Sequence, residues 1–257
     1  IAYYNKGEIK ERYYNPNNFF NEIHIISFII KDIEESKVQI LVGNAKLFIH
    51  SVGKITYFNK EKKKREVIKL INEINPDIIR AYNPFLEGWI AAHCSKELNI
   101  PFFVSLHVQY DQLRKLLGSR NYKKKIALKY SEKIIEPFVL KTADKITAVY
   151  KIIEPYVMRM CNKHPEILYN RIELKRFANA KKNQNFNKPL IITVGRLTPQ
   201  KNHEILIKSI KGLDIYLMII GNGEQKEYLK KLTKEMKLES KVIFKDSVPN
   251  DKIQDYY

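Results

Sequence analysis

Three short segments in the second half of the chain place polar residues directly after an apolar run. The first is GRLTPQK, residues 195–201, in which Arg196 and Lys201 follow the run LIITV. The second is GNGE, residues 221–224, and the third is KDSVPN, residues 245–250. Arginine offers a planar fork that suits phosphate oxygens, lysine offers a compact charge, and glycine lets a ligand approach the backbone. The first segment therefore predicts binding of a phosphate or diphosphate.

Each of these segments stands where a predicted strand ends. The runs LIITV, IYLMII and KVIF have the length and the β-branched content of buried strands. Helical patterns are predicted from Asn202 to Leu213 and from Gln225 to Met236. In open α/β sheets ligands bind outside the carboxyl ends of the strands, and the free N–H groups at a helix start face anions. We therefore expect the three segments to line one nucleotide-shaped crevice.

A structural interpretation remains open for each segment taken singly. Gly221 and Gly223 suit a tight turn that binds nothing, and Arg196 suits an ion pair with a carboxylate. The order and spacing of the three segments together, rather than one of them alone, favour a ligand site.

The first half of the chain repeats the alternation of strand and helix. Strands are predicted at EIHIISF, VQILVG, DIIRA, PFFVSLH, KITAV and EILYN. Helices are predicted after Lys62, from Pro84 to Leu98, from Tyr122 to Thr142 and from Ile152 to Met160. This alternation predicts an α/β fold with parallel sheets that helices cover on both faces.

A polar stretch divides the chain. Between Asn170 and Lys188 there are few large apolar residues, which is typical of a linker. We expect a first domain at residues 1–172, a linker at 171–187 and a partial second domain at 188–257. The second domain is expected to be incomplete, because it shows three strands where about five are usual in a doubly wound sheet.

Composition limits the classes of function. The chain has 257 residues, 44% of them hydrophobic, and no apolar run near the roughly 18 residues that span a bilayer. Its net charge is +18, but the basic excess is spread along helices. Specific nucleic-acid binding is therefore not expected. Peripheral contact with an anionic membrane is expected. The lysine-rich segments 60–65 and 120–125 are interpreted as solvated helix faces. The two cysteines lack the spacing of a metal site.

Several segments together resemble one enzyme family. VGRLTPQKN, YLMIIGNGEQKEYLKKL and VIFKDSVPNDKIQDYY look like the donor-binding half of the GT4 glycosyltransferases; NPDIIRAYNPFLEGWIAA, IPFFVSLHVQYD and ADKITAVYKIIEPYV look like their acceptor-side half. The resemblance implies the GT-B fold, in which two Rossmann-like, doubly wound domains face a cleft. It implies transfer of a hexose from a nucleotide-diphosphate sugar to a glycan or lipid-linked acceptor. Retention of the anomeric configuration, without a metal or other cofactor, is implied as well.

The resemblance also implies roles for residues. Arg196 and Lys201 match the cation pair on the donor diphosphate, and Gly195 matches the glycine that lets the phosphates approach. His107 matches a histidine beside the donor sugar, with a strand cap as its structural alternative. Acceptor contacts are expected at Asn83 and Glu87, for which a turn and a helix-start charge are the alternatives. Further donor contacts are expected from the second and third segments, at Gly221, Asn222, Gly223, Val248 and Pro249.

Some positions depart from the family pattern. Arg171 and Glu173 replace a glycine and an aspartate, and Asp246 replaces a glycine. The family's two glutamates would fall beyond Tyr257 and its first strand is not recognisable, so an inactive fragment of an enzyme is expected. The expected location is the bacterial cytosol, at most peripheral at the inner face of the membrane. Two alternatives stay open: a non-catalytic nucleotide-sugar-binding protein and a basic nucleic-acid-binding protein.

Overall fold

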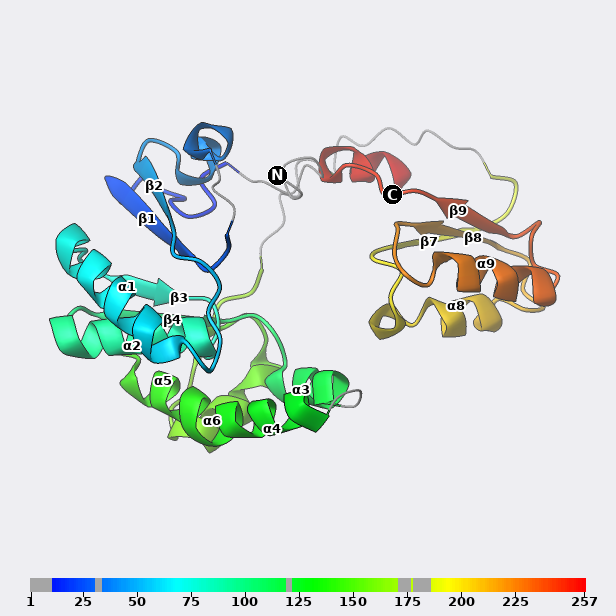
Figure 1. Cartoon of the computed structure of the whole chain (residues 1–257). Coiled ribbons are helices and arrows are strands. Elements are labelled where there is room, and N and C mark those ends of the chain that lie inside the picture. The colour runs from blue at the N-terminus through cyan, green and yellow to red at the C-terminus, as the bar shows by residue number, and fades with distance from the viewer. Residues whose placement is uncertain (1–10, 31–33, 119–121, 171–176, 178–185) are drawn as a thin grey trace. The chain divides into compact units, whose positions relative to one another are not determined.

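The chain forms two compact α/β units (Figure 1). The computed structural model describes residues 11–30, 34–118, 122–170, 177 and 186–257. Within these, one unit comprises residues 22–30, 34–35, 47–118 and 122–170, and the other comprises 11–21, 36–46, 177 and 186–257. The proposed domain limits at 172 and 188 stay predictions, because nearly all of the expected linker, with Arg171 and Glu173, lies outside the described residues.

The strands of the first unit form two sheets. β1 (Glu22–Ser27) pairs with β2 (Lys46–Ser51), and the N–H groups of Lys46 and Val52 donate to the carbonyls of Asn21 and Ser27 at the two ends of this pair. The other sheet is parallel and runs in the order β3, β4, β5 and β6, with bounds Ile79–Ala81, Phe102–Leu106, Lys145–Ala148 and Glu166–Ile167. The predicted strands at DIIRA, PFFVSLH and KITAV are thus confirmed, whereas EILYN is a strand over two residues only.

The predicted helices of this unit are present, with bounds that are shifted or interrupted. α1 (Lys60–Ile74) and α2 (Leu86–Leu98) follow β2 and β3. The single helix predicted from Tyr122 to Thr142 is α4, a π-helical turn η3 and α5, and the last predicted helix is the 3-10 turn η4 followed by α6. α3 (Tyr110–Gly118) was not predicted. The remaining bounds are Tyr122–Tyr130 for α4, Ser131–Ile135 for η3, Glu136–Thr142 for α5, Lys151–Ile153 for η4 and Glu154–Cys161 for α6.

The two faces of the four-stranded sheet differ in chemistry. Alternate strand residues such as Ile79, Val104 and Ile146 join one apolar core with residues of α1, α2, α5 and α6. The intervening residues include Arg80 and Ser105, and the Arg80 Nη2 donates to the Ser105 Oγ at 2.9 Å. Thus the predicted helical cover is confirmed on one face, while the other face of the described sheet carries polar groups that bond to one another.

One strand prediction is wrong. VQILVG contains the 3-10 turn η2 (Gln39–Val42), and the strand β2 begins only at Lys46. The carbonyls of Ile40 and Leu41 accept hydrogen bonds from the N–H groups of Arg12 and Tyr14, at 2.8 and 2.9 Å. A short apolar run fits a buried turn as well as a buried strand, so periodicity alone did not separate the two.

Residues 186–257 of the second unit form one parallel sheet with helical elements on both faces. Its strands β7 (Leu190–Val194), β8 (Tyr216–Ile220) and β9 (Val242–Lys245) pair in that order, as predicted. Leu217 and Ile219 of β8 face the cluster of α8 (His203–Ser209) and α9 (Lys226–Glu235), whereas Met218 and Ile220 pack with the C-terminal 3-10 turn η6 (Asn250–Tyr256). Figure 1 shows α8 and α9 together on one side of the strands.

No helix in the described part of the chain has the length and apolar character needed to cross a membrane.

Candidate functional site

The loop after β7 is tied by backbone hydrogen bonds to the loop after β8. The N–H of Gly195 donates to the carbonyl of Ile220 at 3.0 Å, and the N–H of Leu197 donates to the carbonyl of Asn222 at 2.9 Å. The carbonyl of Leu197 accepts from the N–H of Gln225, also at 2.9 Å. Leu197 itself is fully buried. The two loops therefore form one fixed structure at the carboxyl ends of β7 and β8.

The glycines of GNGE are required by this packing. A Cβ added to Gly221 would lie 1.9 Å from the Gly195 carbonyl oxygen, and its φ of +148° disfavours any other residue. A Cβ on Gly223 would lie 2.4 Å from the Leu197 carbonyl oxygen. The structural alternative thus explains both glycines, which hold the first loop in place whether or not they touch a ligand.

Gly195 differs from these two glycines. A Cβ added there would meet only the Cε of Lys201, at an ordinary distance of 4.0 Å, and its φ is not in the left-handed region. The fold therefore does not require a glycine at this position. The structure also brings Gly195 and the side chain of Lys201 together, as expected for groups that share one ligand.

Arg196 and Lys201 are both exposed. Within residues 186–257 and the other described parts of the chain, neither side chain has an ion-pair partner. The alternative in which Arg196 pairs with a carboxylate therefore has no support from the described residues. Two cations at the mouth of the β7 loop remain available to an anion.

The helix after this loop starts later and ends earlier than predicted. Pro199–Lys201 form a 3-10 turn, η5, Asn202 has a left-handed φ of +54°, and α8 then spans only His203–Ser209. The N–H groups of Lys201 and Asn202 already donate to the carbonyls of Thr198 and Pro199. These two N–H groups are not free to bind an anion, so the side chains of Arg196 and Lys201 carry the argument for an anion site.

His203 is a residue that the sequence analysis did not single out. Its side chain is buried and its Nδ1 has no hydrogen-bond partner among the described residues. Burial lowers the pKa of His203, and the nearby Lys201 charge lowers it further. A neutral imidazole thus lies under the cationic loop. Its place directly after Lys201-Asn202 was the only sequence signal for it.

Lys226, which the sequence analysis did not single out, compensates the charge of Asp246 in the loop after β9. Its Nζ donates to the Asn222 Oδ1 at 3.0 Å and forms a short ion pair with Asp246. The hydrogen bond from Lys226 lowers the pKa of the Asp246 carboxyl. The negative charge at this position is therefore compensated within the unit. Two predicted donor contacts have structural roles here: Val248 packs on the sheet core, and Pro249 precedes η6.

His107 lies in the first unit, directly after β4. Its Nε2 is buried without a hydrogen-bond partner in the described structure, so a strand cap made by this atom is not supported. The imidazole centroid lies 5.5 Å from the centroid of the Tyr82 ring, and the Arg80 guanidinium lies over the same Tyr82 ring, 4.5 Å from its centroid. Burial lowers the pKa of His107, and Arg80 lowers it further. A cleft shared by His107 and Arg196 stays a prediction.

This arrangement predicts a pH effect at His107. Because the pKa of His107 in the folded chain lies below its ordinary value of 6.5, protonation favours the unfolded chain. Stability from this group is complete above about pH 6.5 and declines as the pH falls below it. Arg80→Gln should raise the midpoint of the His107 titration, measured by NMR, since it removes the nearby charge. Arg65→Gln, an exposed arginine on α1, is the matched control and should leave the midpoint unchanged. Equal midpoints in all three proteins would contradict this electrostatic account.

The two predicted acceptor-side residues lie after β3, Asn83 in the loop and Glu87 at the start of α2. The Asn83 Oδ1 accepts a hydrogen bond from the Phe85 N–H at 3.0 Å. Gly88 packs closely on the Asn83 backbone, since a Cβ added to Gly88 would lie 2.3 Å from the Asn83 carbonyl oxygen. The turn alternative therefore explains Asn83. Glu87 is exposed in the first turn of α2, which fits both an acceptor contact and a helix-start charge.

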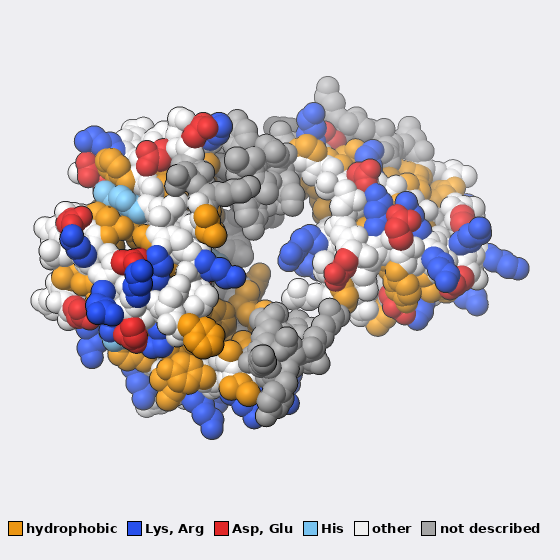
Figure 2. Space-filling model, viewed as in Figure 1, with side chains coloured by type: hydrophobic (Ala, Val, Ile, Leu, Met, Phe, Trp, Pro, Cys, Tyr) orange, Lys and Arg blue, Asp and Glu red, His pale blue; other side chains and the backbone are white. Residues whose placement is uncertain are grey.

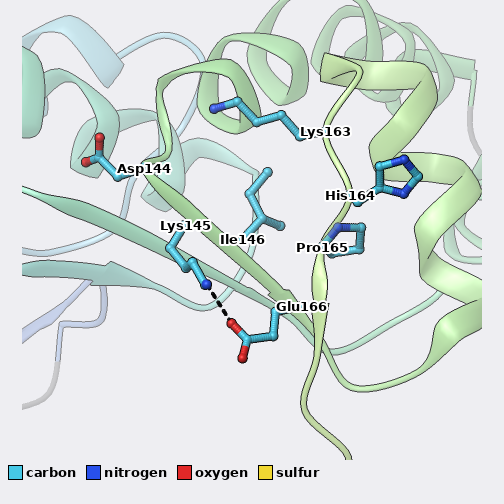
Figure 3. A pocket seen from close by; sticks show the side chains of 7 residues that line it. All are labelled: Asp144, Lys145, Ile146, Lys163, His164, Pro165 and Glu166. Atoms are coloured by element: carbon cyan, nitrogen blue, oxygen red, sulfur yellow. Dashed lines mark ion pairs between the residues drawn. The ribbon is translucent and has the colours of Figure 1, made fainter.

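A hollow lies at the amino ends of β5 and β6 in the four-stranded sheet, at the opposite end of these strands from the predicted ligand side (Figure 3). Its side chains pair with neighbouring groups. The Lys145 Nζ pairs with the Glu166 carboxylate at 2.7 Å, and the Lys163 Nζ donates to the Ala143 carbonyl at 2.7 Å. The His164 Nδ1 lies 2.7 Å from the Glu154 Oε1. These side chains already have hydrogen-bond or ion-pair partners within the unit. Their pairings stabilise the region between the end of α5 and the starts of β5 and β6, so we do not assign the candidate site to this hollow.

Two family models match parts of the chain. Residues 175–257 match the model described as glycosyl transferases group 1. Residues 115–209 match the model described as inner membrane complex protein, but this stretch runs from α3 in one unit to α8 in the other and follows the boundaries of neither.

Curated relatives match over limited lengths. The chain is 41% identical over 81 residues to N-acetylgalactosamine-N,N'-diacetylbacillosaminyl-diphospho-undecaprenol 4-alpha-N-acetylgalactosaminyltransferase of Campylobacter jejuni, which is 30% of this chain and 22% of the relative. It is 26% identical over 148 residues to the uncharacterized glycosyltransferase MJ1178 of Methanocaldococcus jannaschii, which is 58% of this chain and 37% of the relative. The chain thus spans less than two fifths of either relative.

Solved structures share the fold. The lipopolysaccharide outer core galactosyltransferase WaaB superposes with a TM-score of 0.63 at 17% identity, over 88% of this chain and 58% of that one. Anabaena Alr3699/HepE in complex with UDP superposes with a TM-score of 0.64 at 14% identity, over 90% of this chain and 63% of that one. The chain therefore has the GT-B fold of these glycosyltransferases, and its residues 175–257 are similar to the group 1 glycosyl transferase model.

Proposed function

We propose that this chain belongs to an enzyme that transfers a hexose from a nucleotide-diphosphate sugar to a glycan or lipid-linked acceptor. The observation that carries the proposal is the β7 loop, where the exposed cations Arg196 and Lys201 follow a glycine that the fold does not require. A diphosphate fits this combination, because it needs both positive charge and close approach to the backbone. The second unit is then the donor-binding side and the first unit the acceptor side.

The relatives support the two partners of this reaction. The Campylobacter jejuni relative is named as a 4-alpha-N-acetylgalactosaminyltransferase whose acceptor is a sugar on diphospho-undecaprenol. HepE was solved with UDP. These names favour a nucleoside diphosphate as the leaving group and a lipid-linked acceptor for this chain as well. We further propose retention of the anomeric configuration, as in the GT4 enzymes that the sequence resembles.

The chemistry follows from the charges of the site. When the bond between sugar and phosphate breaks, negative charge grows on the leaving oxygen, and cations held in place stabilise the transition state more than the ground state. Arg196 and Lys201 supply these cations, so we propose that transfer needs neither a metal nor another cofactor. His107, kept neutral by burial and by Arg80, offers its Nε2 to a hydroxyl of the sugar.

Gly195→Ala tests the proposal against a structural role for the loop. We expect the melting temperature to stay within about a degree, because the added Cβ meets only the Lys201 Cε at 4.0 Å. Binding of a nucleotide sugar should weaken by about tenfold or more, since the methyl group occupies the space of the phosphates, and each tenfold is about 1.4 kcal/mol. The measurement is calorimetric titration with a panel of nucleotide sugars beside thermal unfolding.

The rival function is a non-catalytic binding protein with the same donor loop. It predicts weaker binding in Gly195→Ala but no sugar transfer by the natural protein to any acceptor. Unchanged binding in Gly195→Ala would contradict both functions and leave the β7 loop with a structural role only.

We also propose that the protein works in the cytosol and touches an anionic membrane from the inner face. The net charge of +18 favours attraction to anionic lipid, which contributes about 1 kcal/mol for each lysine or arginine near the surface and fades with salt. Specific nucleic-acid binding is not proposed.

A further inference from the structure

An exposed apolar stripe runs along α4 and η3. Ile126, Tyr130 and Ile134 expose 53%, 41% and 53% of their surface. Their spacing of four residues places them on one side of a continuous helical segment, although η3 is π-helical. Exposed apolar side chains that gather on one helix face are typical of a surface that contacts another protein or a membrane.

Lysines accompany the apolar residues one by one. Lys125, Lys129 and Lys133 directly precede the three stripe residues and are all exposed. In the described part of the chain none of the three forms an ion pair; the nearby Glu132 pairs with Arg114 and Arg159 instead. On α1, in contrast, the lysines of segment 60–65 pair with glutamates, for example Lys63 with Glu66 at 2.7 Å. The solvated-face interpretation of that segment holds only in part, because the side chains of Lys60 and Lys64 are less than a fifth exposed and lie over the Trp89 ring. The charge beside the stripe is therefore uncompensated.

The loop after β2 adds a further apolar group to this surface. The Tyr57 hydroxyl donates to the Ala127 carbonyl at 3.3 Å, and the Tyr57 ring meets the Tyr130 ring edge to face, with 5.8 Å between centroids. Phe58, the next residue, is fully exposed. The docking face is defined here as Phe58, Ile126, Tyr130 and Ile134 with Lys125, Lys129 and Lys133.

The inner side of the same segment is firmly held. Ser131, Ile135 and Glu136 are buried, and the Glu136 Oε2 accepts from the Arg114 Nη1 at 2.6 Å and from the Tyr156 hydroxyl at 2.5 Å. The docking face is therefore presented on a rigid support. Figure 1 shows α4 at the lower end of its unit, and Figure 2 shows hydrophobic side chains beside Lys and Arg in that area.

We propose that the docking face rests on an anionic membrane surface. The apolar side chains enter the boundary between headgroups and acyl chains, and the three lysines contact lipid phosphates. Alternating lysine and apolar residues fit this surface better than an apolar protein groove, which would bury the three charges without partners. The inference deepens the proposed function by naming the face that brings a lipid-linked acceptor to the first unit, but it can be measured without sugar transfer.

The experiment is co-sedimentation of the chain with vesicles at low salt. Wild type should bind vesicles that contain phosphatidylglycerol and not vesicles of phosphatidylcholine alone. Replacing Lys125, Lys129 and Lys133 by glutamine together should weaken binding by about 10²-fold, because each contributes roughly 1 kcal/mol. The matched control replaces Lys62, Lys69 and Lys231 by glutamine, three exposed lysines that lie within 4.0 Å of a glutamate. It should bind nearly as wild type does.

A second variant tests insertion rather than charge. Ile126→Ser with Ile134→Ser keeps the net charge and should weaken binding by about tenfold or more, with circular dichroism confirming that the chain is folded. Equal loss in the two lysine variants would mean that only total charge acts, and would overturn the proposal. So would vesicle binding that survives loss of both isoleucines, or a dimer in sedimentation that these isoleucine changes abolish while vesicles are not bound. Vesicle binding without sugar transfer would leave the docking face standing and contradict the proposed function alone.

Discussion

Arg196→Ala and Lys201→Ala should each reduce sugar transfer by the natural protein by about 10²- to 10³-fold, the scale seen when one charge partner of a transition state is removed. Both side chains are exposed and have no ion-pair partner in the described structure. Exposed loop cations contribute little to folding, so the free energy of unfolding should change by less than about 0.5 kcal/mol. The expected result is therefore a large loss of rate with an unchanged fold.

The comparison of rate and stability separates a functional from a structural role. His107→Ala should also slow transfer but leave the affinity for a nucleoside diphosphate nearly unchanged, because its proposed partner is the sugar. Lys252→Ala, an exposed cation in η6 of the same unit, is the control for charge alone. Normal rates in Arg196→Ala and Lys201→Ala, with a lower melting temperature, would contradict the donor-site assignment.

Gly221→Ala should be the most destabilising single substitution in the second unit, at about 3 to 5 kcal/mol. Two costs act together here. The backbone φ of +148° disfavours alanine, and the new Cβ would lie 1.9 Å from the Gly195 carbonyl oxygen. Since the β7 and β8 loops are bonded to each other, a shift at Gly221 also displaces Arg196 and Lys201.

Gly212→Ala is the matched control for this substitution. Its φ is +82°, yet nothing lies within 4 Å of the added Cβ, so only the backbone strain of about 1 to 2 kcal/mol is expected. The measurement is denaturant unfolding of both variants beside wild type. Equal destabilisation by the two substitutions would show that the contact with Gly195 does not matter, and that the two loops are less tightly packed than the structure shows.

Local patterns predicted the elements whose residues decide their own structure. β7, β8 and β9 are apolar runs of four to five residues, each ended by polar or glycine residues, and all three are present in the predicted order. α3 is different, because it is held by long-range ion pairs such as Arg114 with Glu136 at 2.6 Å. No pattern within a few residues of α3 shows that partner, although the spacing of Tyr110, Leu113 and Leu117 and the local pair of Asp111 with Arg114 are helical signals that the sequence analysis did not use.

The candidate site was predictable in its residue types but not in their roles. The sequence pointed to Gly195, Gly221 and Gly223 alike, since glycine in a loop fits both a ligand and a tight turn. Only the positions of the Gly195 and Leu197 carbonyls separate them, because these carbonyls occupy the space of a side chain at Gly221 and Gly223 but not at Gly195. In the same way, Lys226 reaches Asp246 across twenty residues, a pairing that depends on the neighbouring positions of β8 and β9.

The central claim, that Arg196 and Lys201 receive a diphosphate, is tested most directly by comparing two ligands on the chain itself. Calorimetric titration with a nucleoside diphosphate and with the matching monophosphate gives the contribution of the terminal phosphate, and a uridine, a guanosine and an adenosine pair cover the bases. We predict that the diphosphate binds more tightly to wild type and that this difference falls by about tenfold or more in the double variant Arg196→Gln with Lys201→Gln. An unchanged difference between diphosphate and monophosphate in the double variant would contradict the account.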